Sequence, residues 1–127
     1  MSAEEHVYMR THALSGPWFR LDINQEISSL RDQMVSGQDK RGVALVKEGG
    51  LRVVLTALIS GATMEEHQAA GPTTVQVLSG RIEVRVGDEK LDLPAGGMVV
   101  FDRHVGHAVV AEEDSAILIT IATDAGD

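Results

Sequence analysis

The spacing of hydrophobic and polar residues predicts one short helix in the first third of the chain. Apolar side chains recur at the spacing of a single helix stripe, at Ile23, Ile27, Leu30 and Met34. Asp22 or Asn24 can cap the start of this helix, and Gly37 is suited to its end. Residues 1–20 have no clear period, so we expect them to form an irregular arm.

After Gly42 the pattern changes to short Val- and Leu-rich runs that are separated by turn residues. Two runs on either side of Glu48-Gly49-Gly50 predict a hairpin, and "RIEVRV" alternates as a strand with one buried face does. "SAILITIA" is apolar almost throughout, which is typical of a strand covered on both faces. The predicted strands are "VALVK", "LRVVLTALI", "TTVQVLS", "RIEVRV", "KLDLP", "MVVFD", "HAVVA" and "SAILITIA". Short strands without crossover helices between them predict an all-β, antiparallel sandwich or barrel.

Composition narrows the class of protein further. A chain of 127 residues is the size of one domain, and its lack of cysteine excludes disulfides, thiolate metal sites and cysteine nucleophiles. The formal charge of -8 argues against nucleic acid as a partner, since phosphate backbones attract basic surfaces. No apolar run has the length of a membrane span, and "MSAEEHVYMR" is unlike a signal peptide. We therefore expect a cytoplasmic protein without a membrane partner.

The stretch from Gly61 to His107 resembles the cupin superfamily of small jelly-roll barrels, also called double-stranded β-helices. The first family motif runs Gly, five residues, His, one residue, His, three or four residues, Glu, six residues, Gly; here Gly61, His67 and Gly80 match it. The second motif is matched by Pro94, Gly96 and His107 in "LPAGGMVVFDRHVGH". The resemblance implies a cupin-like barrel over residues 43–127, preceded by an arm and helix over residues 1–42. It also implies a homodimer, because the family often pairs in this way.

The chain departs from the family at two of the four positions that hold a divalent metal. The second motif histidine is replaced by Ala69 and the glutamate by Thr73, so only His67 and His107 remain. The resemblance therefore implies an incomplete ligand set for a metal such as Zn, Fe, Ni, Cu or Mn, because a catalytic zinc usually takes three protein ligands. On an extended strand the side chain of Glu65 would point to the same side as that of His67, whereas the side chain of Gln76 would point to the opposite side from that of Thr73. His104 belongs to a turn and is expected to be solvated.

Three functions from different classes stay open at this point. The preferred one is a binding protein that holds a small organic molecule in the barrel, with His67, Thr73, Gln76 and His107 as its polar groups. A metal-dependent enzyme of the dioxygenase or isomerase type needs a third ligand, and a metal-free epimerase needs a tyrosine acid, although the only tyrosine is Tyr8 in the arm. A purely structural barrel, with a filled interior and no ligand, is the third.

Overall fold

The computed structural model describes residues 7–8 and 16–123, with side chains for the second range. These residues form β-strands and one helix, as the pattern predicted. The elements in order are β1 (Val7–Tyr8), α1 (Ile23–Asp32), β2 (Lys40–Glu48), β3 (Leu51–Leu58), β4 (Thr63–His67), β5 (Thr73–Ser79), β6 (Arg81–Val86), β7 (Glu89–Pro94), β8 (Met98–Phe101), β9 (His107–Ala111) and β10 (Ser115–Ala122). No helix among the described residues is long and apolar enough to cross a membrane.

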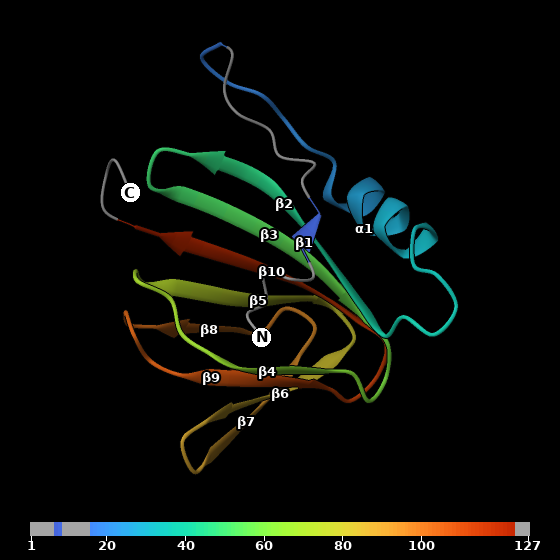
Figure 1. Ribbon diagram of the computed structural model, residues 1–127, viewed down its shortest axis with the longest axis vertical. Helices are drawn as coiled ribbons and strands as arrows, with labels where there is room; N and C mark the ends of the chain where they lie inside the picture. Colours follow the sequence, from blue (N-terminus) through green and yellow to red (C-terminus); the bar gives the residue numbers. More distant parts are fainter. Residues whose placement is uncertain (1–6, 9–15, 124–127) are drawn as a thin grey trace.

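The strands form two sheets that pack face to face, which is the jelly-roll arrangement (Figure 1). The larger sheet has the order β1-β2-β3-β10-β5-β8, and the smaller has the order β4-β9-β6-β7. All pairs are antiparallel except β1 with β2. The apolar run of β10 lies between β3 and β5 in the larger sheet. Both its faces are covered as expected, because Ile117 packs in the core between the sheets and Ala116 packs in the core beside α1.

The alternation within each strand sorts the core into two clusters. The inner cluster lies between the sheets and includes Val75, Val77, Ile82, Val84 and Ile117, all of which have no exposed surface. The helix-side cluster lies between the larger sheet and α1, and it includes Leu30, Val43, Leu45, Leu55 and Ala116. Neighbouring residues of β10 therefore belong to different clusters, because successive strand side chains point to opposite faces.

Helix α1 covers the outer face of β2 and β3 (Figure 1). Asp22 is its N-cap, and the Asp22 carboxylate accepts a hydrogen bond from the Gln25 backbone N–H at 3.1 Å. Ile27 and Leu30 are its buried residues, which confirms the apolar stripe. The Arg31 guanidinium donates to the Ser79 hydroxyl at 3.2 Å and so joins the helix to the end of β5.

Ser79-Gly80 makes a tight turn between β5 and β6, which explains the glycine that closes the first motif. Gly80 has φ of 83°, and a Cβ there would lie 2.3 Å from the Asp114 carbonyl oxygen. A side chain is therefore excluded by backbone geometry as well as by space. The turn sends the chain from the larger sheet to the smaller one.

Candidate functional site

The two histidines of the motifs meet on neighbouring strands of the smaller sheet. His67 ends β4, His107 begins β9, and the two are direct cross-strand partners. Their ring centroids lie 4.4 Å apart with an angle of 61° between the ring planes, an edge-to-face contact. The structure thus brings together two imidazoles that are 40 positions apart in the sequence.

A bulge in β4 turns His67 toward the space between the sheets. Met64 pairs with Val109 and His67 pairs with His107. Between these two pairs β4 advances by three residues, whereas β9 advances by two. Without the extra residue, Glu66 would follow Met64 onto the inner face, because alternate residues share a side. The expectation that Glu65 shares the side of His67 is therefore wrong: the bulge interrupts the alternation, and both Glu65 and Glu66 are exposed.

Phe101 and Thr73 of the larger sheet face the histidines from the other side. The Phe101 ring stacks on the His107 ring, with centroids 4.2 Å apart and the planes within 2° of parallel. Thr73 is the cross-strand partner of Phe101, and its hydroxyl donates to the Gly71 carbonyl oxygen at 3.1 Å. His107 is consequently enclosed by Phe101 and His67, and only 1 % of its surface is exposed.

Backbone carbonyl groups set the tautomer of both rings. The Nδ1 atom of His67 lies 2.9 Å from the Glu65 carbonyl oxygen, and that of His107 lies 3.2 Å from the Val105 carbonyl oxygen. A carbonyl oxygen only accepts hydrogen bonds, so each Nδ1 must carry the proton and donate it. In the neutral form of each ring, Nε2 is left as a lone-pair acceptor.

The Nε2 atom of His107 is buried and has no hydrogen-bond partner within the described part of the chain. Burial lowers the pKa of His107 from its ordinary 6.5, and nearby His67 lowers it further. The Val105 carbonyl group and the Glu66 carboxylate act in the opposite direction. His107 is therefore neutral at neutral pH and presents an unused acceptor, which is uncommon for a buried polar atom.

The stability of the protein should respond to the protonation of His107. Because its pKa is lower in the folded than in the unfolded state, its contribution is fully present above the ordinary 6.5. As the pH falls below that value the unfolded state binds a proton first, so the free energy of unfolding decreases until the folded pKa is reached. Urea unfolding at about pH 7.5 and about pH 5.5 should show a larger loss for the wild type than for His107→Gln. Equal losses would contradict the assignment.

Gln76 was expected at the site but lies outside it, whereas His104 lies in a solvated turn as predicted. Gln76 pairs with Leu118, which packs on the helix-side cluster, so its side chain lies on the far face of β5 and does not join the histidines. Ala69 follows the end of β4 and contributes its carbonyl oxygen, which accepts from the His104 N–H at 2.8 Å. His104 is exposed in the turn before β9, with φ of 64°.

His67 and His107 are too few ligands for the metal site that is typical of the family. Among the residues that the structure describes, no group of three or more His, Cys, Asp and Glu side chains is placed to hold a metal ion. His67 and His107 offer two nitrogen donors, fewer than a catalytic zinc or a two-histidine, one-carboxylate iron site uses. These residues therefore do not fit a complete metal site.

Sequence reasoning missed Phe101 and Glu66 as neighbours of the histidines. A Cβ on Gly106 would lie 3.3 Å from the side-chain carboxyl carbon of Glu66, so this acid packs beside the residue that precedes His107. Neither residue has a signal in its own neighbourhood of the sequence. Phe101 is identified only through the pairing of β5 with β8, and Glu66 only through the bulge.

Comparisons with known proteins agree with this architecture. The chain is similar in structure to a conserved protein of unknown function, SPY1581 from Streptococcus pyogenes, at 23 % identity over 87 % of this chain and 90 % of that one, with a TM-score of 0.67. It is also similar to a cupin superfamily protein, DSY2733 from Desulfitobacterium hafniense, at 21 % identity over 72 % and 84 %, with a TM-score of 0.67.

A larger protein of similar structure is the G106A mutant of salicylate 1,2-dioxygenase from Pseudoaminobacter salicylatoxidans, with a TM-score of 0.71 and 18 % identity. The match extends over 80 % of this chain and 34 % of that one. At these identities the likeness concerns the fold alone. No curated protein matches the chain. The family description "Cupin domain" matches residues 44–122, which is most of the sequence. The chain therefore belongs to the cupin domain family.

Proposed function

We propose that this cupin domain binds a small organic molecule between its two sheets, at His67 and His107. The observation that carries the proposal is the buried Nε2 of His107, which has no partner in the described chain while its ring is neutral. A hydroxyl group of a ligand would satisfy this acceptor, and leaving it unsatisfied costs free energy. The ligand expected here carries an O–H donor on an apolar body.

The surroundings of the two rings suit such a molecule. Phe101 supplies a flat apolar surface beside His107, and partly buried apolar side chains, Val99, Val105 and Ile121 among them, pack around the inner cluster. Small-molecule sites are mostly apolar with a few well-placed polar groups. His67 is partly exposed whereas His107 is not, so a ligand would reach His107 from the side of His67.

Phenol and toluene test the proposal as a matched pair, because they have nearly the same shape and differ in one O–H donor. A purely apolar site prefers toluene, whereas a site with an unused acceptor prefers phenol. We expect phenol to bind about three- to tenfold more tightly, the size of one net hydrogen bond. Backbone amide shifts measured by NMR should change around His67 and His107. Equal affinities, or shifts confined to other parts of the protein, would refute the role of the histidines.

Replacing His67 with alanine should weaken phenol binding by about tenfold and cost little stability. The variant removes a ring that contacts His107 and a second Nε2 acceptor, while its partly exposed position contributes little to the core. His104→Asn is the matched control, since His104 is exposed and asparagine tolerates its φ of 64°. If the two variants bind phenol equally well, His67 has no part in the site.

A metal-dependent enzyme is the second candidate, because both rings donate from Nδ1 to carbonyl groups and so keep Nε2 for a metal. This is the usual arrangement of metal-binding histidines, but it supplies only two ligands. Elemental analysis of the purified protein separates the candidates: one metal ion per chain, lost in His67→Ala, would favour the enzyme. A protein that takes up neither metal nor phenol would favour the structural barrel.

A further inference from the structure

Strand β8 is an edge of the larger sheet, and it lacks the features that usually protect an edge strand from pairing with another chain. Among the described residues it pairs with β5 alone. Its four residues, Met98–Phe101, include no charged residue and no proline, and their register with β5 has no bulge. Natural proteins use these features to guard exposed edges, because unpaired N–H and C=O groups bind readily to another strand.

The other edge strands are guarded. Strand β7 has charged side chains and a proline, and strand β4 has two acids beside its bulge. These residues are Glu89, Lys90, Asp92 and Pro94 in β7 and Glu65 and Glu66 in β4. Strand β1, at the far edge of the larger sheet, has only two residues. The edge at β8 is therefore the one that remains open to another strand within the described sheets.

Hydrogen bonds just before β8 show which of its backbone groups face the open edge. The Val77 N–H donates to the Gly97 carbonyl oxygen at 2.9 Å, and the Gly96 N–H donates to the Val77 carbonyl oxygen at 2.8 Å. In an antiparallel pair, residues that bond to the neighbouring strand alternate with residues whose backbone groups point away from it. Val99, two residues after Gly97, therefore directs its N–H and C=O groups to its partner Val75.

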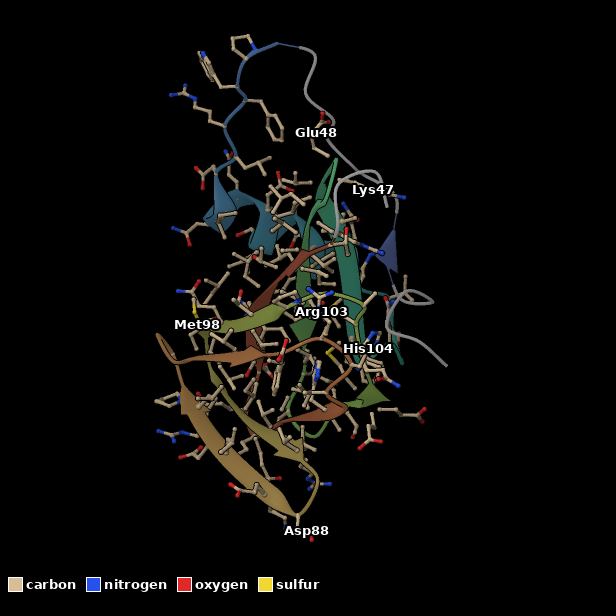
Figure 2. The ribbon with its side chains drawn as sticks, turned by 90° about the vertical axis from the view of Figure 1, so that its left-hand side faces the viewer. Lys47, Glu48, Asp88, Met98, Arg103 and His104 are labelled. Atoms are coloured by element: carbon tan, nitrogen blue, oxygen red, sulfur yellow. The ribbon has the colours of Figure 1, made fainter. Side chains whose placement is uncertain are left out.

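Met98 and Val100, on either side of Val99, consequently direct their N–H and C=O groups to the open edge. Their side chains lie on the outer face of the sheet and are 50 % and 65 % exposed. Figure 2 shows Met98 at the left margin of the view, below the blue helix α1 and on the same side of the molecule. Both the backbone and the side chains of these two residues are thus accessible to another chain.

The outer face beside β8 carries no charge. Two cross-strand rows lead from β8 through β5 to β10, and all their members are apolar or uncharged. The rows are Val100, Thr74 and Thr120, and Met98, Gln76 and Leu118. The chain has 19 acidic and 11 basic residues, so two copies repel each other over much of their surface. An uncharged edge is where two copies can approach without this repulsion.

We propose that β8 pairs with β8 of a second copy of this chain, antiparallel and about a two-fold axis that passes through Val99. Met98 then pairs with the partner's Val100, and Val100 pairs with the partner's Met98, so that each pair exchanges both backbone hydrogen bonds. The apolar side chains of these pairs lie together on the outer face. An axis through Val100 would instead place Met98 opposite the partner's acidic Asp102. Because a two-fold contact is self-complementary, the same uncharged edge serves both subunits.

The contact is a single strand pair, so the dimer is weak, with an expected dissociation constant of about 10–100 μM. Sedimentation from about 5 to about 500 μM protein should show the mean mass rising from one chain toward two. Val100→Pro should stay a monomer, because proline removes an N–H group at the open edge and leaves the pairing with β5 intact. Val100→Ala keeps that N–H group and is the matched control; it should weaken association by no more than about threefold.

Val100→Lys is a second variant, which adds a charge to both subunits beside the axis and should also stay a monomer. Circular dichroism checks that each variant is folded. A wild type that is a monomer up to about 500 μM would leave the edge to a different protein and overturn the inference. Val100→Pro and Val100→Lys proteins that associate as the wild type does would place the contact elsewhere and overturn it too.

Disulfide formation tests the register, because the chain has no cysteine of its own. Across the proposed axis Val99 faces the partner's Val99 in a pair without hydrogen bonds, in which Cα atoms lie about 4.5 Å apart. This distance is within the range of a disulfide. Under mild oxidation Val99→Cys should form a covalent dimer at least about tenfold faster than Val35→Cys, a control whose position is 68 % exposed and lies outside β8. Equal rates would overturn the pairing of β8 with itself.

Discussion

Gly71→Ala is expected to lower the free energy of unfolding by about 3 kcal/mol and to abolish phenol binding. Gly71 is buried at the entrance to β5, and a Cβ there would lie 1.6 Å from the Ala122 carbonyl oxygen at the end of β10. The clash involves backbone on both sides, so no side-chain rotation relieves it. The chain would have to separate β5 from β10 at Thr73, which lies two residues away and faces the histidines.

Urea unfolding measures the loss of stability, and Gly16→Ala is the control. Gly16 has open space around its Cβ position and no left-handed φ, so alanine there should change the free energy of unfolding by less than about 0.5 kcal/mol. A Gly71→Ala protein as stable as Gly16→Ala would show that the close approach of Gly71 to β10 is wrong.

Replacing Ile117 with alanine should cost about 3–4 kcal/mol of stability, because it leaves a cavity at the centre of the inner cluster. Ile117 has no exposed surface and lies between Thr56 of β3 and Val77 of β5 in the larger sheet. Tight packing on both sides leaves little freedom for the neighbouring side chains to fill the space. Chemical unfolding followed by circular dichroism would report the change.

Two further substitutions calibrate this result. Ile117→Val should cost only about 1 kcal/mol, since it removes a single methyl group. Val100→Ala should be nearly neutral, because Val100 on β8 is 65 % exposed. A cost for Ile117→Ala that is close to that of Val100→Ala would mean that the space between the sheets is not the packed interior described above.

Most of the fold could be predicted from the sequence because its strands alternate in a regular way. All eight predicted strands are present with ends that shift by a few residues, and α1 ends at Asp32, before the Met34 that closes the predicted stripe. Strand β4 was missed because its "TMEEH" contains three successive polar residues around a bulge, which hides the period of two. Strand β1 lies inside the arm that was expected to be irregular, and it has only two residues.

The candidate site could be predicted only in part. Motif spacing identified His67 and His107, whereas the prediction that Gln76 joins them is wrong, because Gln76 lies on the opposite face of β5 from Thr73. Phe101 could not be connected to the histidines, because its place opposite His107 depends on the pairing of β5 with β8 and on the packing of the two sheets. Such long-range register is set by packing of the whole sheet rather than by any local pattern.

The most direct test of the account is NMR of the histidine ring nitrogens, with the His107 signals assigned by their loss in His107→Gln. At about pH 7.5 we predict a neutral His107 ring that carries its proton on Nδ1 and a lone pair on Nε2. Addition of phenol should shift the Nε2 signal, and addition of toluene should not. A proton on Nε2, a charged ring, or an Nε2 signal that phenol leaves unchanged would contradict the proposed ligand site.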